Sequence, residues 1–167
     1  MKNILLILAL FLTSFLNAQN SIRITPSPEN QPIIDFIRNN TTKKVGDGVC
    51  GTFVDAAMQQ KIPNWTYSVL WEPEADEHEI NSVDSIQPGD VIYFEFKGSE
   101  TAHIGIVTRI YGNVIWYANQ NVSSGDDLYK TIDYKGRKSE VFAFSRVRHD
   151  FINASDCPGT DIWVYRY

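Results

Sequence analysis

Two residues of this chain, Cys50 and His103, have the types and the surroundings to do covalent chemistry. Cys50 lies in Gly48-Val49-Cys50-Gly51-Thr52, where a helix-like pattern begins. A thiol at a helix N-terminus sits in a positive partial field, which favours the thiolate. His103 begins an apolar, strand-like run, and an imidazole near a thiol can act as general base and acid. Such a pair can attack an amide carbonyl without a metal or a cofactor.

The strand spacing after His103 predicts which side chains share its face of the sheet. If residues 111–113 form a hairpin loop, antiparallel pairing places His103 opposite Asn121 and Gly105 opposite Asn119. His103 and both asparagines then point to one face. An asparagine carbonyl that accepts one imidazole N–H would aim the other ring nitrogen at the sulfur. We favour Asn119 for this role, with Asn121 in support, and Gly105 leaves room for a helix or a substrate.

Both cysteines also have a structural interpretation. In an exported chain, Cys50 and Cys157 could form a disulfide, and the sequence gives no distance that excludes it. A permuted arrangement, in which His103 pairs with Cys157, is a further alternative. If Cys50 is the nucleophile, its own backbone N–H is a candidate oxyanion donor, and the loop from Lys43 to Gly48 could supply the second.

The order of the elements predicts an α+β domain. Apolar residues at helical spacing predict helices over residues 32–39 and 50–60. Alternating apolar residues predict about five consecutive antiparallel strands, and residues 125–137 are a polar excursion between two of them. The expected fold is therefore N-terminal helices packed on one antiparallel sheet. The expected strands cover residues 91–96, 103–110, 114–121, 140–147 and 162–167.

The N-terminus reads as a secretory signal peptide, residues 1–18, ahead of a single domain, residues 19–167. Loss of Lys2 would leave 14 basic and 20 acidic side chains, a net charge of −6. We therefore expect no nucleic-acid partner and no stable membrane anchor after cleavage. There is no Walker loop, GxGxxG or zinc-site spacing, so no metal and no cofactor is expected. His78 and His149 read as solvated residues.

Four motifs in order, GVCGTFVDAAM, IQPGDVIYF, HIGIVTRI and WYANQNV, resemble the CHAP family of cysteine, histidine-dependent amidohydrolases/peptidases. The chain is also similar to the related NlpC-type cell-wall peptidases, and both families belong to the papain-like superfamily. The resemblance covers residues 46–122. It implies a papain-like amidase fold with Cys50 as nucleophile and His103 as base. The family's third motif residue is often a glutamate in Glu-Gln-Asn, and here Asn119 replaces it.

The resemblance implies a secreted or periplasmic enzyme that cuts an amide bond in peptidoglycan, or another peptide substrate, through a thioester. Trp65, Trp71 and Trp116 are candidates for substrate recognition, since no separate wall-binding domain is evident. The competing hypothesis is an inactive module of the same fold with a Cys50–Cys157 disulfide. Such a module would bind cell-wall glycan or a protein partner.

Overall fold

The computed structural model spans the chain, and it describes residues 22–96, 102–120, 128–132, 138–143, 146–153 and 160–167. The predicted α+β class is confirmed, because helices precede a run of antiparallel strands. The helical elements are α2 (Gln31–Asn40), α3 (Cys50–Met58), η1 (Tyr67–Trp71), η2 (Pro73–His78) and η3 (Val83–Ser85). The strands are β1 (Ile22–Arg23), β2 (Val91–Phe96), β3 (Ala102–Tyr111), β4 (Val114–Asn119), β5 (Leu128–Ile132), β6 (Lys138–Ala143), β7 (Arg148–Asn153) and β8 (Thr160–Tyr165).

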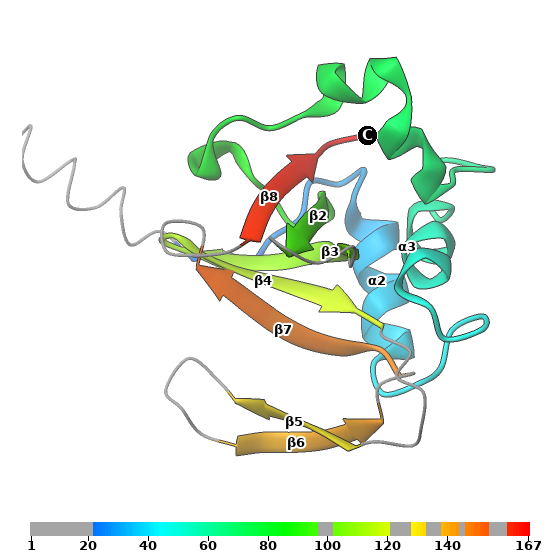
Figure 1. Cartoon of the computed structure of the whole chain (residues 1–167), viewed down its shortest axis with the longest axis vertical. Helices are drawn as coiled ribbons and strands as arrows, with labels where there is room; N and C mark the ends of the chain where they lie inside the picture. The colour runs from blue at the N-terminus through cyan, green and yellow to red at the C-terminus, as the bar shows by residue number, and fades with distance from the viewer. Residues whose placement is uncertain (1–21, 97–101, 121–127, 133–137, 144–145, 154–159) are drawn as a thin grey trace, which may run out of the picture.

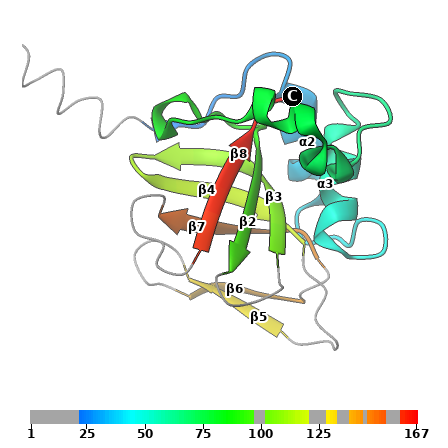
Figure 2. The same ribbon diagram turned by 45° about the horizontal axis from the view of Figure 1, so that its top comes forward.

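The main sheet is open, antiparallel and six-stranded among the described residues, where about five strands were predicted. Its order is β7-β4-β3-β2-β8, and β1 pairs with the end of β3. The expected fourth strand, residues 140–147, overlaps β6 but is wrong in its place: among the described residues β6 pairs with β5, and the strand beside β4 is β7. β5 also lies within the segment that was expected to be a polar excursion. In both views of the ribbon the β5–β6 pair lies apart from the six strands of the main sheet (Figures 1 and 2).

The hairpin that joins β3 to β4 closes differently from the prediction. Residues 112–113 alone form the turn, and Tyr111 pairs with Val114. The predicted three-residue loop over 111–113 is therefore wrong at the tip. Because side chains alternate along a strand, this error of one position would exchange the two faces of the sheet if the ladder continued unbroken.

A β-bulge restores the predicted register where it matters. The pairing shifts between Val107 and Arg109, which leaves Thr108 as an extra residue in β3. Beyond the bulge Val107 pairs with Tyr117, as the predicted loop required. The faces expected for the residues near His103 are thus the faces observed.

The two helices cover one face of the sheet, and both lie on the same side of it in Figures 1 and 2. α3 has its apolar residues at the spacing of one helical face. They are fully buried in a cluster with α2 and the facing strand residues. Burial of each large side chain stabilises the fold by about 1.5–3 kcal/mol. This cluster includes Phe53, Val54, Ala57 and Met58 of α3, Ile33 and Ile37 of α2, and Ile104, Ile106 and Ala118 of the sheet.

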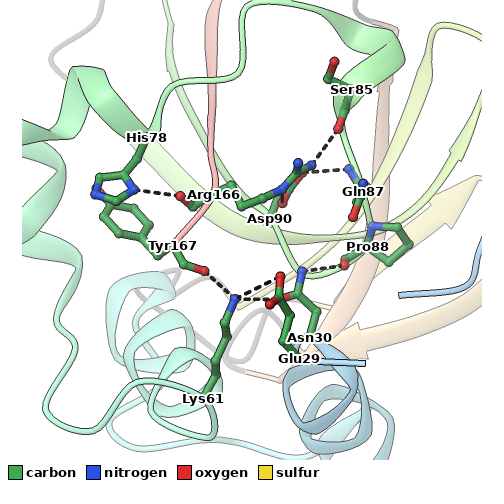
Figure 3. Close-up of polar contacts among 10 residues, drawn as sticks. All are labelled: Glu29, Asn30, Lys61, His78, Ser85, Gln87, Pro88, Asp90, Arg166 and Tyr167. Carbon is green, nitrogen blue, oxygen red and sulfur yellow. Dashed lines mark hydrogen bonds and ion pairs between the residues drawn. The ribbon is translucent and has the colours of Figure 1, made fainter. Parts of the chain in front are cut away.

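A polar network holds the end of β8 against the turn that precedes β2. The buried carboxylate of Asp90 accepts hydrogen bonds from Arg166 Nε and Nη2, both at 2.9 Å, and from the Gln87 backbone N–H at 2.7 Å (Figure 3). Lys61, just beyond α3, donates to Asn30 Oδ1 at 3.0 Å. The network therefore connects β2, β8 and both helices, and it fixes the frame on which α3 presents its N-terminus.

Candidate active site

The chain enters α3 through a tight loop, and Cys50 is the first residue of the helix. Gly46 and Gly48 have φ values of +56° and +97°, which side chains with a Cβ rarely adopt. Asp47 bridges the loop to the helix: its Oδ1 accepts from the Val49 N–H at 3.0 Å and from Thr52 Oγ1 at 2.6 Å. The predicted helix start is confirmed, and the Cys50 side chain is half-buried and carries a free thiol.

Burial raises the pKa of the Cys50 thiol, and hydrogen bonds from the backbone amides of Ile104, Gly51 and Cys50 itself lower it by less. The expectation that the helix terminus favours the thiolate is therefore wrong in its net direction. Removal of the sulfur from water outweighs the local positive field. A nucleophile in this setting needs a base to take its proton, and the Ile104 amide places the sulfur beside the backbone of β3.

His103 is buried on β3, next to Ile104, and it lines the same cavity as Cys50. This cavity has a volume of about 110 Å³. The Tyr117 ring meets the imidazole edge to face, with centroids 6.5 Å apart and planes at 66°. The structure therefore brings the predicted nucleophile and base to one small opening between α3 and the sheet.

Asn119 lies on the face of the sheet that carries His103. The Asn119 Cβ is 3.4 Å from the point where a Cβ of residue 105 would stand, so Gly105 is its immediate neighbour. A Cβ at position 105 would also lie 2.7 Å from the Ala118 carbonyl oxygen. This contact is too close for a side chain, so only glycine fits there. Asn119 Nδ2 donates to Asp150 Oδ2 at 2.8 Å. Asn121 and Cys157 lie outside the described residues.

Gln120 is a site residue that the sequence did not reveal. Its side chain is fully buried and closes on the loop before α3: Oε1 accepts from the Val45 N–H at 2.7 Å, and Nε2 donates to the carbonyls of Val45 at 2.8 Å and Val49 at 3.3 Å. It thus anchors the segment that sets the position of Cys50. The Val45 N–H is occupied by this contact, and the Gly48 N–H by the Val45 carbonyl at 3.1 Å, so neither amide is available as the second oxyanion donor.

Aromatic rings form one wall of the cavity. The Tyr67 ring lies directly on Gly51, where an added Cβ would be 2.6 Å from the ring. Trp71 meets both Tyr67 and Tyr93 edge to face, with centroids 5.5 Å and 5.8 Å apart. All three rings line the opening beside Cys50.

Of the tryptophans proposed for recognition, Trp71 alone lines this cavity. Trp65 is buried in the core against Tyr167, and Trp116 lines a different cavity, where the Arg109 guanidinium lies over its ring, 5.9 Å from the ring centroid.

The other two histidines are half-buried and packed against other residues, so the prediction that they are solvated is wrong in part. His78 stacks on Tyr167 with ring centroids 4.2 Å apart, and its Nδ1 is 2.8 Å from the Arg166 carbonyl. His149 lies with Nε2 3.4 Å from Thr41 Oγ1. In the described part of the chain, no group of three His, Cys, Asp or Glu side chains is arranged to hold a metal ion. The helices of that same part include none with the length and apolarity to cross a membrane.

Comparison of the chain with protein-family models, with curated proteins and with solved structures finds no match.

Proposed function

We propose that this chain is a cysteine hydrolase of papain-like, CHAP-type fold that cleaves an amide bond of peptidoglycan. The observation that carries the proposal is the shared cavity of Cys50 and His103, with the sulfur against the Ile104 backbone. Two groups 53 positions apart reach one opening because α3 packs on β3. The resemblance of the four motifs supplies the substrate class, and the signal-peptide pattern supports a secreted or periplasmic location.

In the proposed reaction, His103 takes the thiol proton while the sulfur of Cys50 attacks the carbonyl carbon of the amide. The carbonyl oxygen becomes an oxyanion, and we expect the backbone N–H of Cys50, at the start of α3, to donate to it. The imidazolium returns its proton to the nitrogen as the C–N bond breaks, which leaves a thioester. Water, deprotonated by His103, then releases the acid and restores the thiol.

The raised pKa of the thiol makes this base essential. A sulfur whose thiolate is disfavoured by burial reacts slowly at neutral pH unless the proton has an acceptor within reach. We expect Asn119 to orient the imidazole, since it shares the face of His103 and lies beside Gly105. We expect the scissile amide to enter the cavity of about 110 Å³ against its aromatic wall.

The test is mass spectrometry of purified wall fragments after incubation with the mature protein. We expect new amine and carboxyl ends, and their loss in Cys50→Ala and His103→Ala while Cys157→Ala keeps the activity. The Cys157 variant is the matched control, because it removes the other thiol of the chain. Undiminished cleavage by folded Cys50→Ala would refute the assignment. A disulfide-bonded binding module would be favoured if the non-reduced protein leaves the fragments intact and a thiol count on it finds no free thiol.

A further inference from the structure

The contact between Asn119 and Asp150 fixes the orientation of the Asn119 amide. An ionised carboxylate can only accept hydrogen bonds, so the Asn119 atom that lies 2.8 Å from Asp150 Oδ2 must be the amide nitrogen. β7 pairs with β4 so that Asp150 lies opposite Tyr117, which puts the carboxylate on the face that Tyr117 and Asn119 share. The carbonyl oxygen of Asn119 therefore points away from Asp150.

That oxygen, Asn119 Oδ1, is buried and has no hydrogen-bond partner among the described residues. Buried carbonyl groups are rarely left without a donor, because the loss of water around them is costly. On β3, the residues of this face that lie nearest Asn119 are Gly105, its immediate neighbour, and His103, two positions before Gly105. The Tyr117 ring lies against both, 2.8 Å from the missing Cβ of Gly105 and edge to face with the imidazole.

We propose that Asp150 is a positioning residue of the site: it holds the Asn119 amide so that Oδ1 accepts an N–H from the His103 imidazole. The inference rests on the proposed function and deepens it, because it assigns a carboxylate to the hydrogen-bonded chain behind the base. Asp150 orients Asn119, Asn119 orients His103, and His103 serves the sulfur. Polarisation of the amide by the carboxylate makes Oδ1 a stronger acceptor.

The negative charge of Asp150 has a second effect. A carboxylate near the imidazole favours its protonated form, which is the form that accompanies the thiolate. Burial lowers the pKa of His149, the residue that precedes Asp150; the charge of Asp150 raises this pKa, and the charge of Arg109 on β3 lowers it. His149 and Arg109 remain unchanged in the variants below.

The experiment follows the alkylation of Cys50 by iodoacetamide between pH 5 and 10, resolved from Cys157 by mass spectrometry of peptides. This rate reports the coupling of sulfur and imidazole and needs no knowledge of the substrate. Asp150→Asn keeps an acceptor for the Asn119 amide but removes the charge. Asp150→Ala removes both, and Asp35→Asn, at a half-exposed carboxylate of α2 that pairs with Arg38, is the control for net charge.

We expect Asp150→Asn to reduce alkylation at neutral pH about tenfold, equivalent to one pKa unit, and Asp150→Ala to reduce it further. The exchange variant Asn119→Asp/Asp150→Asn keeps one amide and one carboxylate in contact with their places reversed. It should recover most of the rate that Asn119→Asp alone loses through repulsion of two adjacent carboxylates. Recovery by exchange separates positioning from mere structural support.

The possible failures are distinguishable. If His103→Ala leaves the alkylation profile unchanged, the Cys50–His103 pair and the proposed function fail together. If His103→Ala alters the profile but Asp150→Asn and Asp150→Ala both match Asp35→Asn, the role of Asp150 is refuted and the hydrolase stands. Should Asp150→Ala not fold, the near-isosteric Asp150→Asn and the exchange variant still decide the outcome.

Discussion

Replacement of Gln120 by alanine should weaken both the fold and the nucleophile. The side chain is fully buried, and its loss removes three hydrogen bonds to the loop before α3. The carbonyls of Val45 and Val49 keep other donors, the Gly48 and Phe53 N–H groups. The Val45 N–H loses its partner, at about 1–3 kcal/mol for an unsatisfied donor. With the space left by the missing side chain, we expect Gln120→Ala to lower the free energy of unfolding by roughly 2–4 kcal/mol.

Gln120→Glu should behave differently, because it keeps the size of the side chain but not its donor. One oxygen can still accept from Val45, while the other faces the carbonyls of Val45 and Val49. These contacts and burial raise the pKa of the new carboxyl above its value in the unfolded chain. A raised pKa means that the folded state holds the proton longer. Stability relative to the parent chain is therefore retained at acid pH and lost as pH rises through the folded-state pKa.

Urea unfolding at several pH values measures both effects, and the alkylation rate of Cys50 reports the position of the sulfur. A displacement of about 1 Å can cost 10²-fold in rate, so loosening the loop should slow hydrolysis well beyond the loss of folded protein. Gln60→Ala is the matched control, since Gln60 is exposed just beyond α3 and its side chain donates to the Ala56 carbonyl. A Gln120→Ala protein as stable and as reactive as Gln60→Ala would show that the clamp does not position Cys50.

Three further outcomes follow from the packing. Arg166→Met should lower the free energy of unfolding in urea by about 2–4 kcal/mol, because Asp90 would remain buried without its cation. The effect is smaller than that of losing a fully buried partner, because the Arg166 guanidinium is partly exposed. Burial lowers the pKa of His149, so stability should fall as pH drops below about 6.5, and His149→Gln should flatten that part of the profile; an unchanged slope would contradict this. Gly51→Ala should lower the melting temperature, because its Cβ would clash with the Tyr67 ring, and Tyr67→Ala in the same chain should restore it.

The parts of the site that the sequence could predict are those with local signals. The start of α3 at Cys50 follows from apolar residues at helical spacing after a glycine-bearing loop, and β3 follows from a run of apolar residues after His103. Both signals depend on residues within a few positions of the group concerned. Neither depends on which other segment packs there.

The remainder depends on partners far away in the sequence. Gln120 is separated from Val45 by 75 positions, and Asn119 from Asp150 by 31, so no spacing rule connects them. β7 was missed because residues 148–153 lack the regular alternation that marked the other strands. The upward shift of the Cys50 pKa could likewise not be predicted from the sequence. The field of a helix terminus is a local property, whereas burial depends on the packing of the whole domain.

The alternation of β4 explains why two adjacent residues can serve two different halves of the site. Asn119 points to the face of His103, while Gln120, one position on, points to the loop that leads into Cys50. The bulge at Thr108 decides this assignment, because the register of the turn, continued without it, would place Gln120 opposite Gly105. The amide that now holds the nucleophile loop would then face the base, and Asn119 would face the helix. An irregularity of one residue in β3 therefore sets which side chain supports the sulfur and which supports the imidazole.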